Sequence, residues 1–224
     1  TAYAGDASAR TYLRLRRPDG ARAVLMDADP ARGEATGPFL AVAAFLRDAG
    51  LSPPAIMASD TAQGFLLLED LGDTIFARIA EDAPGREPGL YAAAGELLAT
   101  LQRHAPPADW PRATAAHLGD ALAPLFEDYA PEAAAHRHPA ARALTEAIEA
   151  LGETTAVPIL RDFHAENLIW LPERDAEARV GLLDFQDALF GHPAYDLVSL
   201  IEDARRDVSL ELAAPLKQRF MDQA

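Results

Sequence analysis

The first seventy residues show the periodicity of strands, interrupted by a single helical segment. Residues 11–16 alternate apolar and polar side chains, which is the pattern of a half-buried strand. A Pro-Asp-Gly turn signal at residues 18–20 leads into the apolar run at residues 23–26, so we predict a hairpin. Pro and Gly bound a helical pattern over residues 38–50, and residues 64–68 form a continuous apolar strand. This part of the chain is therefore expected to be mostly β with one main helix.

Beyond this point the apolar residues recur mainly at helical spacing. Three such stripes predict helices, over residues 90–101, 118–129 and 144–151. Three short apolar runs then predict strands before a last helix, at residues 158–160, 168–171 and 180–183. We therefore predict an α+β fold with a β-rich lobe over residues 1–70 and a larger, mostly helical lobe over residues 71–224. Because the chain ends inside a helical pattern, we expect the second lobe to be incomplete.

Composition narrows the classes of partner. The chain of 224 residues has 20 Lys and Arg against 35 Asp and Glu, a net charge of −15, which argues against general binding to nucleic acid or to anionic membranes. It contains no cysteine, so disulfides, thiolate metal sites and cysteine nucleophiles are excluded. No apolar run approaches the length of a membrane span and no leader pattern opens the chain, so we expect a soluble, cytoplasmic protein.

Three polar side chains stand where predicted strands end. Asp162 and Asn167 lie five residues apart on a short loop, and Asp184 follows Asn167 by seventeen residues, after the next hairpin. Such spacing alone is common, and Asp and Asn at strand ends also form turns and caps. The complete order of strand, Asp, Asn, strand, turn, strand and Asp is more specific, so we expect the three side chains to converge.

The three residue types suit phosphoryl transfer. A carboxylate such as Asp162 accepts the proton of an attacking hydroxyl and aligns it. The amide oxygen of Asn167 and the carboxylate of Asp184 are oxygen ligands for Mg²⁺, which needs only one or two carboxylates beside phosphate and water. The chain has no G-x-S-x-G, H-E-x-x-H or G-x-x-x-x-G-K motif, which leaves hydrolase, zinc-protease and P-loop interpretations without support.

The segment that holds these residues resembles a known family. The Asp-Phe-His-x-x-Asn run at residues 162–167 and the Gly-His-Pro-Ala-Tyr-Asp-Leu run at residues 191–197 resemble motifs of the aminoglycoside phosphotransferase and choline kinase-like family. The stretch 160–208 is most similar to bacterial anomeric kinases of N-acetylmuramate and N-acetylglucosamine, and residues 5–8 and 65–73 fit the same group. The resemblance implies a two-lobed, protein-kinase-like fold that uses ATP and Mg²⁺.

The resemblance also implies roles for individual residues. Asp162 would be the catalytic base, Asn167 and Asp184 would bind the metal, and Asp196 would support the loop. The stretch from Gly5 to Ser8 would lie over the phosphates, and a hinge at residues 69–71 would contact adenine, so the cofactor-binding set includes Ser8, Glu69 and Leu71. His164 is expected to hold the loop rather than to act in catalysis.

Two positions depart from the family pattern. Leu160 stands where the family usually has a supporting His. Met26 stands where a phosphate-binding Lys is expected, and the small lobe has no Lys at all. Arg10 and Arg22 are therefore included as candidate phosphate ligands, because guanidinium groups bind phosphate bidentately, although a single strand arginine more often faces solvent.

The sequence leaves alternatives open for the function. We predict an ATP-dependent phosphotransferase for the anomeric hydroxyl of an N-acetylated amino sugar. An aminoglycoside or a choline-type acceptor is the alternative within enzymes, because an acidic chain favours cations. A nucleotide-binding module without transfer activity is the alternative outside enzymes, and Met26 is the reason to consider it. The spacing of His136 and His138 is no argument for a metal site in this Ala-rich, Pro-flanked context.

Overall fold

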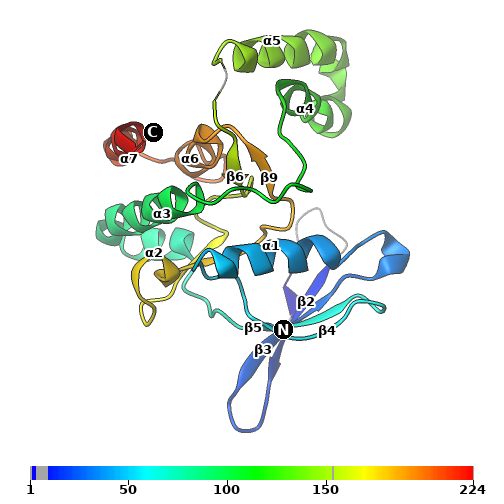
Figure 1. Ribbon diagram of the computed structural model, residues 1–224, viewed down its shortest axis with the longest axis vertical. Helices are drawn as coiled ribbons and strands as arrows, with labels where there is room; N and C mark the ends of the chain where they lie inside the picture. The colour runs from blue at the N-terminus through cyan, green and yellow to red at the C-terminus, as the bar shows by residue number, and fades with distance from the viewer. Residues whose placement is uncertain (1, 4–9, 153, 224) are drawn as a thin grey trace.

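The computed structural model describes residues 2–3, 10–152 and 154–223 (Figure 1). One five-stranded antiparallel sheet contains all the strands of the N-terminal part, in the order β1-β2-β3-β5-β4. Their bounds are β1 (Ala2–Tyr3), β2 (Thr11–Arg16), β3 (Arg22–Asp27), β4 (Ile56–Asp60) and β5 (Phe65–Glu69). Ser8 lies outside the described residues, so its predicted place over the phosphates is not addressed by the structure.

The sheet packs on helix α1 (Gly37–Asp48), which lies between the sheet and the rest of the molecule in Figure 1. The helix begins beside Pro38 and buries Phe39, Val42 and Leu46 on one face, as the apolar spacing predicted. In the sheet, Met26 pairs with Leu66 in the register of β3 and β5, and both side chains are fully buried. The small sheet and α1 therefore share one apolar layer.

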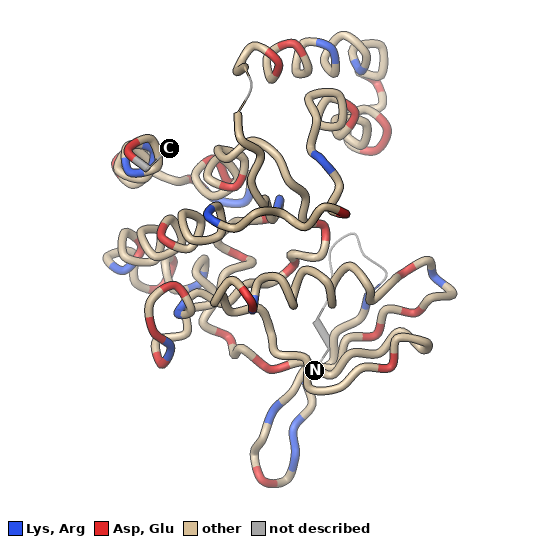
Figure 2. The backbone as a smooth tube through the Cα atoms, in the orientation of Figure 1, with Lys and Arg blue, Asp and Glu red and all other residues tan. Residues whose placement is uncertain are grey.

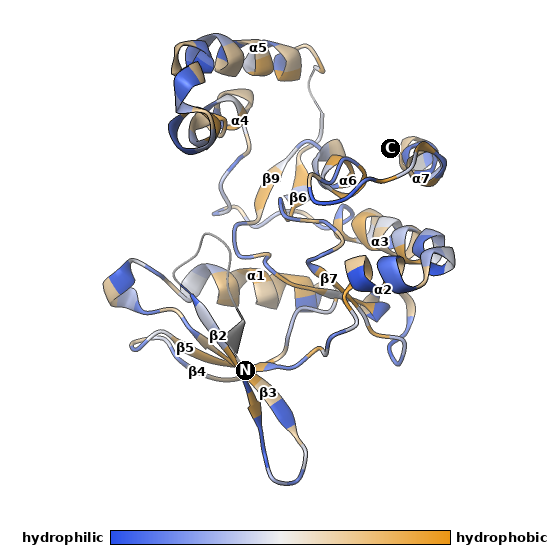
Figure 3. Ribbon diagram, turned by 180° about the vertical axis from the view of Figure 1, so that it is seen from behind, coloured by the Kyte–Doolittle hydropathy of each residue, from blue (hydrophilic) through white to orange (hydrophobic). Residues whose placement is uncertain are grey.

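The remaining strands form two short antiparallel pairs. β6 (Val157–Ile159) pairs with β9 (Leu189–Gly191), and β7 (Leu168–Trp170) pairs with β8 (Val180–Leu182). These strands are mostly buried, and Figure 3 shows hydrophobic residues along them. Because the pairs have no exposed face, they present only their connecting loops to solvent.

Helices surround these strands. The α-helices are α2 (Phe76–Asp82), α3 (Glu87–Leu101), α4 (Ala115–Asp120), α5 (Arg137–Glu149), α6 (Ala194–Ile201) and α7 (Leu210–Gln223). Shorter helical turns are η1 (Pro30–Arg32), η2 (Pro84–Arg86), η3 (Leu125–Tyr129), η4 (Pro131–His136) and η5 (Ala176–Arg179). None of the helices within the described ranges is both long and apolar enough to cross a membrane.

Helices α4 and α5 project away from the main body in Figure 1 and pack against each other. Gly119 permits this close approach, because a Cβ at that position would lie 2.5 Å from Thr145 Oγ1 and 2.8 Å from the carbonyl oxygen of Ala141. The predicted continuous helix over residues 118–129 is wrong, since α4 ends at Asp120 and a wider helical turn follows at η3. Pro124 lies between them and has no N–H to continue the ladder.

The α+β class and the antiparallel small sheet with one main helix agree with the prediction from the sequence. The elements that were not predicted include β4, α2 and β9. The main apolar core contains residues of the small sheet together with residues of the helical part, Met26 and Leu182 among them. The domain boundary near residue 70 stays a prediction.

Candidate active site

The loop between β6 and β7 is fixed by a carboxylate from a distant helix. Asp196, on α6, is completely buried and accepts hydrogen bonds from the backbone N–H of Leu160 at 2.7 Å and of Arg161 at 2.9 Å. Burial raises the pKa of Asp196 to about 7, and the two backbone hydrogen bonds oppose the rise. The supporting role that the family resemblance gave to Asp196 corresponds to these two hydrogen bonds.

Two residues of the site have a left-handed backbone. Arg161 has a φ of 72° and Asp184 has a φ of 54°. For residues other than glycine this conformation costs about 1–2 kcal/mol, so surrounding contacts must hold it. At Arg161 the N–H bonds to Asp196, and the carbonyl oxygen accepts from Ser199 Oγ at 3.0 Å.

Asn167 uses its amide nitrogen to hold the loop. Its Nδ2 donates to the carbonyl oxygen of Asp162 at 3.0 Å and lies 3.2 Å from His164 Nε2. Its backbone N–H donates to the carbonyl oxygen of His164 at 2.9 Å. The Oδ1 atom has no hydrogen-bond partner among the described residues, which leaves a hard oxygen free to bind a cation.

The β7–β8 hairpin brings Asp184 next to this loop. The backbone N–H of Leu183 donates to the carbonyl oxygen of Asn167 at 3.0 Å, so Asp184 follows directly beside it. Asp184 is exposed, and its Oδ1 accepts from Gln186 Nε2 at 2.7 Å. Burial raises the pKa of Asp162, and the negative charge of Asp184 adds to that rise. The two carboxyl groups therefore lie close enough to repel each other.

The donor set fits a magnesium ion that arrives with a nucleotide. Asn167 Oδ1 and the Asp184 carboxylate are two oxygen donors, and Mg²⁺ completes its shell with phosphate and water oxygens. The described ranges contain no cluster of three His, Cys, Asp or Glu residues of the kind that makes a closed metal cage. The residues present therefore suit a shared, open site rather than a permanent structural one.

His164 is a structural part of the loop. It is buried, and burial is the main reason that its pKa is lowered, which favours the neutral form of the ring. Its Nε2 faces the amide of Asn167 at 3.2 Å, and its Nδ1 is buried without a partner among the described residues. This arrangement agrees with the expectation that His164 holds the loop.

The small sheet presents Arg10 and Tyr12 on the side of the site. Arg10 Nε lies 2.8 Å from Glu34 Oε2, in an ion pair whose side chains are mostly buried. Burial raises the pKa of Tyr12, and the charge of Asp184 contributes to the rise, so Tyr12 lies near that carboxylate. Met26 is fully buried beneath this face and opposite Tyr12 in the register.

A cluster of opposite charges ties β2 to the segment that follows β5. Arg14 Nη1 donates to Asp73 Oδ1 at 2.7 Å, Nη2 donates to Asp70 Oδ1 at 2.9 Å, and Nε lies 2.8 Å from Asp70 Oδ2. Asp70 also accepts the N–H of Gly72 at 3.0 Å. Arg22 Nε lies 3.8 Å from Asp70 Oδ2, so the structure places this predicted ligand at the hinge segment.

The predicted hinge joins the small sheet to the helical part. Glu69 accepts the N–H of Ala55 at 3.1 Å and forms an ion pair with Arg174, while the Leu71 side chain packs against Ile169 and Leu171. Neither the backbone N–H nor the carbonyl of Leu71 has a hydrogen-bond partner in the described part of the chain. Both groups are available to a planar heterocycle.

Charge is distributed unevenly along the chain. Figure 2 shows basic residues on both strands of the β2–β3 hairpin, with acidic residues spread over the rest of the tube. A hollow of about 420 Å³ lies at the outer end of the small sheet, lined by residues such as Asp27, Pro30 and Phe65. No described residue of the predicted site lines it, so we assign it no part in the site.

Several contacts of the site were not anticipated from the sequence. Glu34 pairs with Arg10, Gln186 contacts Asp184, and Ser199 holds Arg161. Gln186 stands two residues after the predicted ligand, so proximity in the sequence was a usable signal. Glu34 and Ser199 lie far from their partners along the chain, and no local pattern marks them.

Comparison with known proteins identifies the family. The profile of a family described as "phosphotransferase enzyme family" matches residues 1–222. An N-acetylmuramate/N-acetylglucosamine kinase from Caulobacter vibrioides is 39% identical over 260 residues, which cover 97% of this chain and 70% of that protein. A Pseudomonas aeruginosa protein of the same name is 34% identical over 217 residues, covering 89% of this chain and 58% of the relative. The chain thus spans between 58% and 70% of the length of these two relatives.

Solved structures show the same fold. A choline kinase from Streptococcus pneumoniae superposes with a TM-score of 0.73 at 14% identity, covering 99% of this chain and 74% of that one. An aminoglycoside phosphotransferase from Streptomyces rimosus, in complex with ADP and streptomycin, gives a TM-score of 0.64 at 14% identity, covering 95% of this chain and 85% of that one. The predicted kinase-like fold and the predicted enzyme class are confirmed, and the chain belongs to the phosphotransferase enzyme family.

Proposed function

We propose that this chain transfers the terminal phosphoryl group of ATP to a hydroxyl group of a small molecule, namely the anomeric hydroxyl of N-acetylmuramate or N-acetylglucosamine. The observation that carries the proposal is the approach of Asp162, Asn167 and Asp184 at the ends of β6, β7 and β8. The names of the relatives from Caulobacter vibrioides and Pseudomonas aeruginosa support the choice of acceptor.

Asp162 is the residue that meets the acceptor. Its carboxylate accepts the proton of the attacking hydroxyl and aligns the oxygen with the phosphorus. Asn167 and Asp184 hold Mg²⁺, which, when bound, neutralises charge on the phosphate oxygens. The buried carboxylate of Asp196 fixes the loop backbone, so this alignment needs no reorganisation during the reaction.

Arg10 supplies the positive charge for the phosphates that a lysine at the position of Met26 would otherwise provide. It directly precedes β2, and its guanidinium forms an ion pair with Glu34. The ion pair with Glu34 orients this guanidinium, and guanidinium groups are well suited to bind phosphate. Ser8, which lies outside the described residues, stays a proposed phosphate contact.

The hinge segment receives the base of the nucleotide. The unpartnered backbone groups of Leu71 are suited to the edge of adenine, and Glu69 anchors the end of β5 beside them. Arg22 lies at this end of the site, 3.8 Å from Asp70, and contributes positive charge next to the hinge. In this proposal Arg10 contacts the phosphates of the nucleotide, and Leu71 contacts its base.

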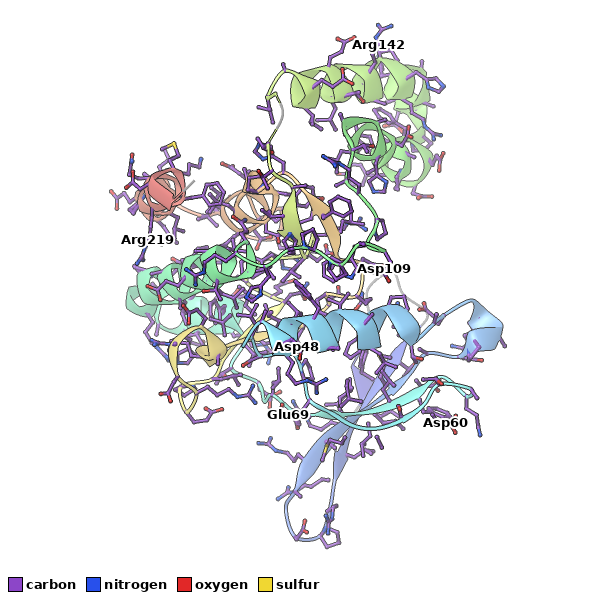
Figure 4. All side chains as sticks on the ribbon, viewed as in Figure 1. Asp48, Asp60, Glu69, Asp109, Arg142 and Arg219 are labelled. Carbon is purple, nitrogen blue, oxygen red and sulfur yellow. The ribbon has the colours of Figure 1, made fainter. Side chains whose placement is uncertain are left out.

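Turnover of the full chain with ATP and Mg²⁺ tests the proposal. N-acetylmuramate, N-acetylglucosamine, choline and an aminoglycoside serve as acceptors, and ADP release is followed. Asp162→Asn should lower kcat by about 10²–10⁴-fold, and Asp184→Asn should abolish Mg²⁺-dependent turnover. Asp60→Asn is the matched control, because Asp60 lies at the far edge of the small sheet in Figure 4. Equal activity of the wild type and Asp162→Asn would refute the proposal.

The same assay separates the two candidate phosphate ligands. Arg10→Gln should raise KM for ATP strongly, whereas Arg22→Gln, at the hinge end, should change it little. ATP binding with no turnover on any acceptor would favour the alternative, a nucleotide-binding module without transfer, for which the buried Met26 is the specific observation. Turnover on choline or the aminoglycoside alone would move the acceptor to that class.

A further inference from the structure

A loop that follows α6 places an arginine beside the proposed catalytic loop. Arg205 Nε lies 3.3 Å from Glu166 Oε2, and Glu166 belongs to the loop between Asp162 and Asn167. Both side chains of this pair are about half exposed, at 46% and 52%. A pair this exposed contributes at most about 1 kcal/mol, so another carboxylate can replace Glu166 at little cost.

The backbone around Arg205 is held on both sides. The buried Asp203 accepts the N–H of Arg205 at 2.9 Å. On the other side, Arg206 forms an ion pair with Glu87, donates to Tyr91 Oη at 2.7 Å and lies over the Tyr91 ring. These contacts fix the backbone at Arg205. The Arg205 side chain itself is half exposed and is held only weakly, by its pair with Glu166.

A second arginine is adjacent to Asp162 in the sequence. Arg161 precedes Asp162 directly, and its backbone is fixed by Asp196 and Ser199. Its guanidinium has no partner among the described residues. The positive charges of Arg161 and Arg205 each lower the pKa of Asp162, although burial and Asp184 outweigh them, so both guanidinium groups lie near this carboxyl.

We propose that Arg205, assisted by Arg161, binds a carboxylate on the acceptor and makes the enzyme prefer an anionic acceptor to a neutral one. The inference rests on the proposed function. N-acetylmuramate carries a lactyl carboxylate that N-acetylglucosamine lacks, so the two sugars differ in the group that a guanidinium recognises. The whole chain has a net charge of −15, whereas two arginines place positive charge next to the proposed catalytic base, Asp162.

The test compares three acceptors on the full chain: N-acetylmuramate, its carboxamide, and N-acetylglucosamine. The ratio of kcat/KM for the acid to that for the amide isolates the carboxylate charge. Arg205→Gln should lower this ratio by about tenfold or more, because it should reduce kcat/KM for the acid more than for the amide or for N-acetylglucosamine. Glu166→Gln should raise the ratio, because it removes the competing carboxylate. Arg219→Gln, which breaks an exposed pair with Glu96 between α7 and α3, is the control.

Each outcome decides the inference. An unchanged ratio in Arg205→Gln, or an equal loss for all three acceptors, overturns it, since the second result describes a structural residue. Calorimetric binding of the acid and the amide is measured in parallel. If the wild type turns over none of the sugars, the proposed function fails, and a preference for binding the acid that Arg205→Gln removes still supports the subsite. Equal binding of acid and amide to the wild type overturns the subsite.

Discussion

The buried carboxylate of Asp196 makes the anchoring of the catalytic loop testable by pH. Asp196→Asn keeps the size of the side chain and one acceptor oxygen, and it removes the ionisable group. In the wild type the two carboxylate oxygens accept from the N–H groups of Leu160 and Arg161 at 2.7 and 2.9 Å. In the variant one of these N–H groups faces an amide nitrogen, which costs about 1–3 kcal/mol at every pH.

The pH dependence follows from the pKa of Asp196. Burial raises it from the ordinary 3.8 to about 7, which corresponds to about 4 kcal/mol at about 1.4 kcal/mol per pH unit. A carboxyl with a raised pKa in the folded state favours folding while it is protonated. That contribution is fully present below pH 3.8 and is lost as the pH rises through about 7. Relative to Asp196→Asn, the wild type should therefore lose about 4 kcal/mol of unfolding free energy between pH 4 and pH 8.

Urea unfolding, followed by tryptophan fluorescence at intervals between pH 4 and pH 8, measures this difference. The mismatched amide lowers the unfolding free energy of the variant by the same amount at every pH. Only a change with pH in the difference between the two unfolding free energies reports the titration of Asp196. Ser199→Ala is the control, because it weakens the hold on Arg161 without removing a titrating group. Parallel curves for the wild type and Asp196→Asn would show that the carboxyl titrates normally, and the reasoning would be wrong.

Three further substitutions test contacts at the hinge and between α4 and α5. Arg14→Gln leaves the buried Asp70 with only a distant cation, so it should lower the unfolding free energy by about 3 kcal/mol and raise KM for ATP, as denaturation and kinetic assays would show. Arg174→Ala breaks a more exposed pair and should cost less than about 1 kcal/mol in the same denaturation assay. Gly119→Ala should cost about 1–3 kcal/mol through its clash with Thr145, with KM for ATP unchanged; an unaltered melting temperature would contradict the packing described.

Local patterns were enough to predict the neighbourhood of the proposed catalytic residues. Asp162 and Asn167 share one loop, and the β7–β8 hairpin returns the chain to Asp184, so contacts close in the sequence bring them together. The ion pair of Arg10 with Glu34 joins two segments that no periodicity connects. The sequence therefore indicated which cations were available, and only the fold shows which carboxylates they pair with.

The elements that escaped prediction have identifiable physical reasons. β4 is an edge strand whose residues are mostly exposed, so it lacks the alternation that marks a strand. The stripe over residues 118–129 has helical spacing, but Pro124 interrupts the hydrogen-bond ladder within it. The spacing of apolar residues indicates which side chains are buried. It does not indicate whether the hydrogen-bond ladder of a helix can continue through the segment.

The hydrogen bond that Asp196 accepts from Leu160 has a consequence for the order in which the chain is synthesised. It joins Leu160 to a residue 36 positions later in the chain. At a synthesis rate of about 5–20 residues per second, the proposed catalytic loop is made about 2–7 s before the carboxylate that shapes it. A nascent chain, or a fragment cut before α6, therefore holds Asp162, Asn167 and Asp184 without the support that aligns them.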